Sequence, residues 1–360
     1  MPWTCRWTRH PLRAGLPALL VLTIAGCAPT LPDPDFVGFA CPEPCSLHAT
    51  AWAGDTLLGD SGQPLIDQQG WDAPFAHLDH LQLGDAFIVN AEAPITALTE
   101  PHNDPPGWHY NAFPDAAQAL ARFGVDAIGL ANNHVYDRGP AGLEDTVEHA
   151  RDAGMVAFGA GLDAGQAAEP LIIETLHGRL AVLAFGRGFS SVPEAERTSP
   201  GALRYSAENL RAGHDLALER GADVVAAFVH WGANYSHVDR SQRSAAQRFV
   251  DAGYDLVVGH GSHMQQEIAF IGEVPILYSL GNFIFGTGGR FTEEFPGFGL
   301  VARTFLDGDG VRGIAVRCIA TDNGDVRFQP RACDPADAED VLQGLHPAID
   351  VIDGEGWIGW

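Results

Sequence analysis

The sequence predicts an α/β domain, because apolar runs of strand length alternate with helical stretches from His48 onward. Two further observations support this class. The chain of 360 residues is 46% hydrophobic and 19% charged, so it can bury a large core. Polar side chains also follow the ends of several runs. The predicted strands are Ala49–Ala53, Ala86–Asn90, Val125–Leu130, Leu180–Phe185, Val224–His230, Leu256–Gly259 and Ile276–Leu280.

Proline, serine and glycine mark the ends of three predicted helices. These helices run from Pro114 to Gly124, from Pro140 to Gly154, and from a Ser241 cap to Gly253. After Phe298 the pattern changes to alternating residues in Gly299–Phe305 and Gly313–Ile319, with Asp307-Gly308 and Asn323-Gly324 as turns. We therefore expect a domain at 48–290 and a C-terminal β extension with hairpins at 291–360.

The N-terminal segment has the order of a secretory signal. Three arginines precede the apolar run Leu16–Ala25, which is too short to span a bilayer. The following Gly26-Cys27 resembles a bacterial lipobox, so residues 1–26 are expected to be removed and Cys27 lipidated. Cleavage nearby with Cys27 as a free thiol is the alternative. We expect an exported protein held on a membrane by lipid, with 27–47 as a Pro- and Asp-rich tether.

Four further cysteines follow the lipidation site: Cys41, Cys45, Cys318 and Cys333. An even number in an oxidising compartment favours disulfides, with three possible pairings. Local pairs, Cys41 with Cys45 and Cys318 with Cys333, are the preferred hypothesis. Zinc binding by Cys41 and Cys45 is the alternative.

The formal net charge is −25, and every basic residue is an arginine. Such a surface repels nucleic acid and favours cations. A polyanionic substrate would therefore need metal ions or local arginines, for which Arg187, Arg240, Arg243 and Arg290 are candidates. The glycine-rich stretch Gly286–Arg290 could cradle an anion, although a flexible turn is the more common role of such a segment.

Possible metal ligands follow five predicted strands, at the ends where reactive side chains collect in α/β domains. They are Asp55, Glu92, the segment Asn132-Asn133-His134, His230, and the pair His260 and His263. Carboxylate, amide and imidazole donors suit Zn, Mn or Fe. A lone histidine is more often structural than a ligand, but repetition at successive strand ends favours a metal site.

Several segments resemble the CapA (PgsA) family, which is linked to poly-γ-glutamate capsule synthesis. They are Gly54-Asp55, Asn90-Ala91-Glu92-Ala93-Pro94, Asn132-Asn133-His134 through Asp137, His230-Trp231-Gly232, and Tyr278–Phe283. The resemblance spans roughly His48 to Phe285 in the family's order. It implies a four-layer α/β/β/α sandwich of the calcineurin-like metallophosphoesterase type, with two divalent metal ions at one end.

The resemblance also implies roles for individual residues. Asp55 and His263, joined by His260, would bind one metal, and Asn133 and His230 the other. Glu92 would bridge or approach both. His134 would protonate the leaving oxygen, with Asp137 orienting it; otherwise His134 is a structural residue beside a turn.

The sequence departs from the family pattern at several places near the site, including Gly261 in place of a frequent second histidine and Ser262 in place of a proline, which makes His263 a safer ligand than His260. Asn234 stands where a glutamate is usual, and Thr56-Leu57 after Asp55 replaces the common aspartate-x-histidine pair. Asp60 could compensate, although it is more typical of a turn.

Three functions remain open at this point. The first is a metal-dependent phosphoesterase-like hydrolase acting on an anionic polymer or a phosphorylated envelope substrate. The second is a metal-dependent γ-glutamyl amide hydrolase. The third is a non-catalytic partner of a membrane capsule-synthesis or polymer-export complex.

Overall fold

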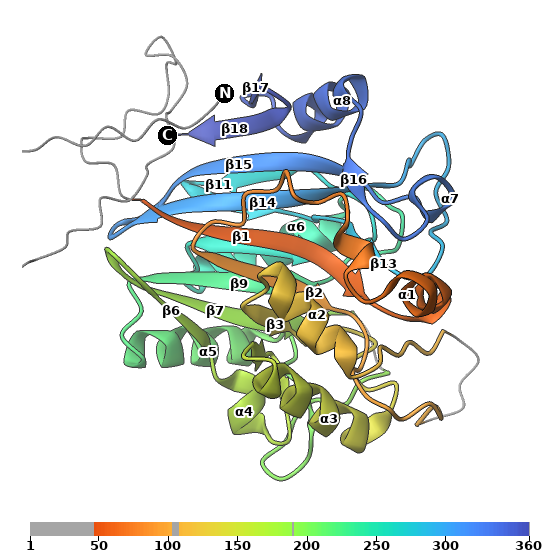
Figure 1. The fold of residues 1–360 in the computed structure, drawn as a ribbon. Coiled ribbons are helices and arrows are strands. Elements are labelled where there is room, and N and C mark those ends of the chain that lie inside the picture. The colour runs from red at the N-terminus through yellow and green to blue at the C-terminus, as the bar shows by residue number, and fades with distance from the viewer. Residues whose placement is uncertain (1–46, 103–107, 189–190, 360) are drawn as a thin grey trace, which may run out of the picture. The chain divides into compact units, whose positions relative to one another are not determined.

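The computed structural model describes residues 47–102, 108–188 and 191–359, and in them two mixed sheets pack against each other (Figure 1). The first has the order β17-β18-β15-β14-β1-β2-β3-β4, with β13 paired to β1 and β16 to β15. The second has the order β11-β12-β10-β9-β7-β6. The proposed signal, tether, Cys27, Cys41 and Cys45 lie outside the described residues.

All seven predicted strands are present, with ends that differ from the predicted ones by up to four residues, and the sheets also contain strands that were not predicted, such as Val156–Phe158, Leu171–Thr175 and Asn282–Phe285. The first sheet contains β1 (His48–Leu57), β2 (Ala86–Ala91), β3 (Ala127–Gly129), β4 (Val156–Phe158), β13 (Asn282–Phe285), β14 (Phe298–Asp307), β15 (Gly310–Ala320), β16 (Arg331–Ala332), β17 (Asp350–Ile352) and β18 (Glu355–Gly359). The second contains β6 (Leu171–Thr175), β7 (Gly178–Gly186), β9 (Val224–His230), β10 (Leu256–His260), β11 (Ile268–Ile271) and β12 (Val274–Leu277). A small ribbon pairs β5 (Ala160–Gly161) with β8 (Gly201–Ala202).

Alternate residues of the central strands enter different cores, which explains why these strands are apolar throughout. In β1, Trp52 packs between the two sheets, whereas Ala51 and Ala53 face outward. In β7, Val182 faces inward and Leu183 outward. Both faces of each sheet are therefore buried.

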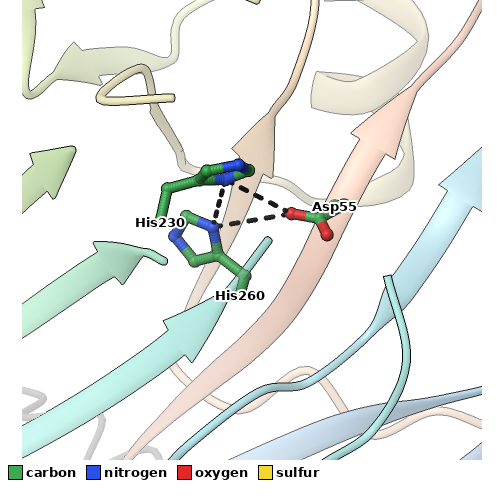
Figure 2. Close-up of side chains that lie close together, drawn as sticks. All are labelled: Asp55, His230 and His260. Atoms are coloured by element: carbon green, nitrogen blue, oxygen red, sulfur yellow. Dashed lines mark hydrogen bonds and ion pairs between the residues drawn. The ribbon is translucent and has the colours of Figure 1, made fainter. Parts of the chain in front are cut away.

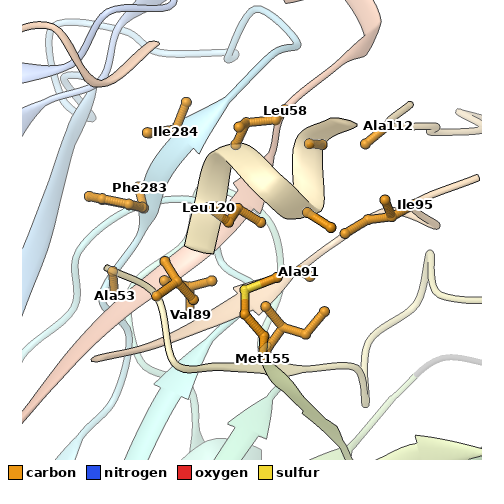
Figure 3. Close-up of a cluster of buried hydrophobic side chains, with 14 of the residues drawn as sticks. Ala53, Leu58, Val89, Ala91, Ile95, Ala112, Leu120, Met155, Phe283 and Ile284 are labelled. Carbon is orange, nitrogen blue, oxygen red and sulfur yellow. The ribbon is translucent and has the colours of Figure 1, made fainter. Parts of the chain in front are cut away.

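Helices cover the outer face of each sheet, whereas Leu342 and Leu345 of the last helix join the core between the sheets. The helices are α1 (Gln63–Gln69), α2 (Asp115–Phe123), α3 (Gly139–Asp152), α4 (Ala164–Ala168), α5 (Ala207–Glu219), α6 (Arg240–Asp251), α7 (Asn323–Val326) and α8 (Pro335–Leu345). Leu120 of α2 packs over Val89 of the first sheet (Figure 3), and Phe249 of α6 packs on Phe185 of the second. The predicted four-layer α/β/β/α arrangement is confirmed. Within the described segments, every helix is too short or too polar to cross a bilayer.

The start of α6 differs from the prediction. Asp239, not Ser241, caps this helix: its side chain accepts a hydrogen bond from the backbone N–H of Gln242 at 2.7 Å. The Gln242 side chain in turn accepts one from the backbone of Asp239 at 3.2 Å. This reciprocal capping box satisfies two backbone donors that Ser241 does not reach.

The C-terminal segment contains the expected hairpin but also a helix. The hairpin β14–β15 turns at Asp307–Gly310, as predicted. The second expected turn is wrong, because Asn323 and Gly324 lie in the short helix α7, capped by Asp322. Helix α8 was not predicted. A disulfide between Cys318 in β15 and Cys333, which lies just before α8, confirms the predicted local pair.

Candidate metal centre

A bulge in β1 aims Asp55 into the site. The register between β1 and β2 shifts between Ala53 and Asp55, and the backbone N–H of Asp55 donates to the carbonyl of Gly281 at 2.9 Å. A Cβ on Gly54 would lie 1.9 Å from that same oxygen, so only glycine fits there. Bulges of this kind redirect side chains at the ends of strands.

The other candidate ligands also lie at carboxyl ends of strands. Glu92 follows β2, whereas His230 and His260 end the neighbouring strands β9 and β10 and pair with each other in register. His263 follows in the loop after β10, at a positive φ of 58°. Figure 2 shows that Asp55 from one sheet and His230 and His260 from the other point toward one another.

Asp55, His230 and His260 have the spacing of ligands to one ion. The Nδ1 atoms of the two histidines are 3.0 Å apart, and they lie 3.7 Å and 3.5 Å from Oδ1 of Asp55. Ligands bound tetrahedrally at zinc distances are about 3.3 Å apart. The three separations lie around this value.

A second group consists of Asp55, Glu92 and His263. His263 Nδ1 lies 3.2 Å from Oδ2 of Asp55, and its Nε2 lies 3.7 Å from Oε1 of Glu92. The Nε2 atom of His230 is 3.6 Å from the same Glu92 oxygen. Asp55 thus belongs to both groups, with one oxygen facing each. The resemblance implies that Glu92 bridges or approaches both ions and that His230 binds with Asn133. In the structure Asp55 lies between the two groups and His230 lies beside His260, and Glu92 Oε1 is close to a histidine of each group.

Glu92 is fully buried, yet neither carboxylate oxygen accepts a hydrogen bond from the described residues. Burial, together with the charge of Asp55, raises the pKa of Glu92 well above its usual range. A buried carboxylate without donors is costly unless a cation approaches it. The donor set therefore fits divalent metal ions.

Asp55 has the opposite electrostatic environment. Burial would raise its pKa, but interactions with His260 and His263 outweigh this and hold the pKa of Asp55 well below its usual range. Asn90 Nδ2 and the backbone N–H of Gly261 also donate to its two oxygens, at 2.9 Å and 3.0 Å. Asp55 is therefore an ionised carboxylate fixed in position.

Burial also lowers the pKa of His230 well below its usual value, and that of His260 in the same direction. Both rings are therefore neutral around neutral pH. A neutral imidazole keeps the lone pair that a metal ion needs.

Two asparagines support the cluster and were given no role from sequence. Asn90 Nδ2 lies 3.3 Å from Nδ1 of His230, and its Oδ1 accepts from Asn132 at 3.1 Å. Asn282 Oδ1 is 3.0 Å from Nδ1 of His263. Both are fully or almost fully buried, and an asparagine within an otherwise apolar strand was the signal that could have identified them.

His134 is paired with Asp137. Its Nδ1 lies 2.8 Å from Oδ2 of Asp137, which also accepts from the backbone N–H of Tyr110 at 2.7 Å. The ring of Tyr110 packs on His134 with centroids 4.1 Å apart. The rings of Tyr110 and His263 both pack on Phe285, at 5.5 Å and 5.0 Å, so a chain of ring contacts links His134 to the candidate ligand His263.

The remaining predicted residues have other contacts. The Oδ1 atom of Asn133 is buried without a hydrogen-bond partner in the described part. Asp60 hydrogen-bonds the hydroxyl of Thr287. Asn234 is exposed, and its carbonyl accepts a hydrogen bond from Ser236.

Solved structures of low sequence identity share parts of this architecture. One is a hypothetical protein from Thermus thermophilus (15% identical, TM-score 0.45, 75% of this chain and 98% of that one). Another is a putative 5'-nucleotidase from Staphylococcus aureus (11% identical, TM-score 0.40, 80% of this chain and 53% of that one). Because both TM-scores are below 0.5, the family assignment rests on sequence.

Three curated relatives are similar over much of the chain. Capsule biosynthesis protein CapA of Bacillus anthracis is 28% identical over 67% of this chain and 60% of its own length. PGA biosynthesis protein CapA of Bacillus subtilis is 27% identical over 68% and 65%. A probable polyglutamine synthesis accessory protein of Mycobacterium tuberculosis is 34% identical over 59% of each. The matched region thus spans less than two thirds of each relative.

A family model described as bacterial capsule synthesis protein PGA_cap matches residues 49–287. This range begins in β1, ends just after β13, and includes every candidate ligand described above. The chain belongs to this bacterial capsule synthesis protein family.

Proposed function

We propose that this chain is an exported, lipid-anchored hydrolase with a two-metal site that acts in the synthesis or export of an anionic capsule polymer. The observation that carries the proposal is the pair of ligand groups sharing Asp55. Family membership supports the capsule setting, and the lipobox-like Gly26-Cys27 supports the lipid anchor.

Different residues of the site would bind the metal ions and donate the proton. Asp55, Glu92, His230, His260 and His263 would hold the cations, and Asn133 has a free oxygen that could join them. Two bound divalent ions would supply a hydroxide nucleophile near neutral pH and stabilise negative charge on oxygen. His134, oriented by Asp137, would donate a proton to the leaving group.

Two substrate classes fit this site: a phosphoester of an envelope component, and the γ-glutamyl amide bond of a capsule polymer. The names of the relatives favour the second, because two of them are biosynthesis proteins for capsule or PGA. Both would be cleaved by the same nucleophile. The experiment that separates them is hydrolysis of phosphomonoester, phosphodiester and γ-glutamyl oligomer substrates by the metal-loaded protein.

One observation favours a non-catalytic role as partner of a membrane polymer-export complex. Leu57 and Asn234 stand where a histidine and a glutamate are common, so two possible site groups are absent. The metal site would then have no catalytic activity and would only stabilise the fold.

Metal content by elemental analysis tests the proposal. We expect two divalent ions per chain in the wild type and fewer in His230→Ala, with no change in His77→Ala, an exposed histidine outside the cluster. A folded wild-type protein that binds no metal would contradict the hydrolase and leave the export partner as the better account.

A further inference from the structure

Tyr235 packs against His263, one of the candidate metal ligands. Its ring centroid lies 5.8 Å from that of His263, and its backbone N–H donates to the carbonyl of Ser262 at 2.8 Å. The residue has a positive φ of 52°, which is uncommon for a bulky side chain. The loop therefore holds this ring in a specific position beside a candidate ligand.

Arg290 lies on Tyr235. Its guanidinium carbon is 5.1 Å from the ring centroid, a cation–π distance. Phe291, the next residue, packs edge-on against the same ring at 5.4 Å. Tyr235 thus contacts both the guanidinium of Arg290 and the imidazole of His263.

The charge of Arg290 is not neutralised within the described segments, where no carboxylate lies within ion-pair distance of it. Arg243, by contrast, pairs with Glu267 at 2.7 Å. Arg290 is also exposed, so a ligand can reach it. What distinguishes Arg290 from other exposed arginines, such as Arg211, is its contact with Tyr235, whose ring packs on His263.

A guanidinium fixed on an aromatic ring presents its N–H groups in a planar fork that matches the oxygens of a carboxylate or phosphate. The ring limits the conformations of the side chain, so less entropy is lost when an anion binds. Elsewhere the negative surface repels such a ligand.

We propose that Arg290, supported by Tyr235, binds an oxyanion of the substrate next to the metal centre and makes this site selective for acidic substrates. The role of this anion site in substrate selection rests on the proposed hydrolytic function. Whether Arg290 binds an anion can be tested without assuming that function. A carboxylate of a γ-linked glutamate polymer and a phosphate oxygen share this chemistry.

The test is calorimetric binding of two probes, inorganic phosphate and a short γ-linked glutamate oligomer, to the full chain with and without added metal. We expect Arg290→Gln to weaken binding of at least one probe by about 10-fold or more, as expected for a lost charged hydrogen bond. Arg290→Lys should retain part of the affinity. The exposed Arg211→Gln on α5 is the matched control and should bind as the wild type does.

The outcomes separate the sources of the anion and the two hypotheses. Weaker binding of phosphate alone supports a phosphoryl ligand, and weaker binding of the oligomer alone supports a carboxylate ligand. Equal binding by wild type and Arg290→Gln, an equal loss in Arg211→Gln, or no binding of either probe to the wild type would overturn the assignment. A wild type without metal would contradict the hydrolase, whereas the comparison in chelator-treated protein would still decide the role of Arg290.

Discussion

Asn282 accepts a hydrogen bond from the Nδ1–H of His263 across 3.0 Å. This contact directs Nε2 of His263, the nitrogen without that proton, toward Oε1 of Glu92 at 3.7 Å. A partner on the far ring nitrogen fixes the tautomer and orientation of a metal-binding histidine. Asn282, which begins β13, therefore connects the first sheet to the ligand loop of the second.

Replacing Asn282 with alanine should weaken metal binding. Loss of such a supporting contact typically lowers metal affinity by about 10- to 100-fold. Metal titration of the chelator-treated protein would measure this, with Asn209→Ala at the start of α5 as the control. Unchanged affinity in Asn282→Ala would show that the contact has no part in metal binding.

Asp55 and Glu92 should differ in how many ions they hold. Asp55 belongs to both ligand groups, whereas Glu92 belongs to one. We therefore expect Asp55→Asn to lose nearly all bound metal and Glu92→Gln to retain about one ion per chain. Elemental analysis after dialysis would show the difference. Equal losses in the two variants would contradict a shared Asp55.

His134→Asn should lower the turnover rate without removing metal. His134 contacts Asp137 and Tyr110 and is outside both ligand groups. A general acid typically contributes about 10²- to 10⁴-fold to rate. Steady-state kinetics with any substrate that the wild type cleaves would test this, with His77→Asn as the control. A parallel loss of metal would instead make His134 part of the ligand set.

The strands and the two-sided burial were predictable from sequence because they depend on local apolar runs. The strand ends at Asp55, Glu92, His230 and His260 followed directly from those runs. Helix α8 could also have been found, since Ala338, Leu342 and Leu345 have helical spacing. This helix was missed because the whole C-terminal segment was expected to form β-hairpins.

The grouping of the ligands could not be predicted in the same way. It depends on the bulge at Gly54, on the register that pairs His230 with His260, and on the distance between two sheets. None of these is visible in local periodicity. The contact of Tyr235 with Arg290 joins two loops 55 positions apart in the sequence and is equally non-local.

Glycine 54 allows a clear test of the bulge. A methyl group on Gly54 would overlap the carbonyl of Gly281, so Gly54→Ala should destabilise the fold by about 1–3 kcal/mol and displace Asp55. Gly344→Ala in α8 meets no atom within 4 Å and should stabilise by about 0.5–1 kcal/mol. Chemical denaturation would measure the change in the free energy of unfolding of both variants. An unchanged stability in Gly54→Ala would show that Gly54 does not lie this close to the carbonyl of Gly281.

Glu92→Gln should change stability in opposite directions with and without metal. In the metal-free protein, Glu92 is buried without a hydrogen bond from the described residues and its pKa is raised, so folding near neutral pH requires it to take up a proton; a neutral amide avoids this cost and should stabilise the fold by about 1–3 kcal/mol. With metal added, the variant lacks a ligand and gains less from binding, so the wild type should become the more stable protein. Thermal unfolding of both proteins, in chelator and in excess Mn²⁺ or Zn²⁺, would reveal this crossover. A variant that is less stable under both conditions would show that Glu92 has a structural partner and is not held for a cation.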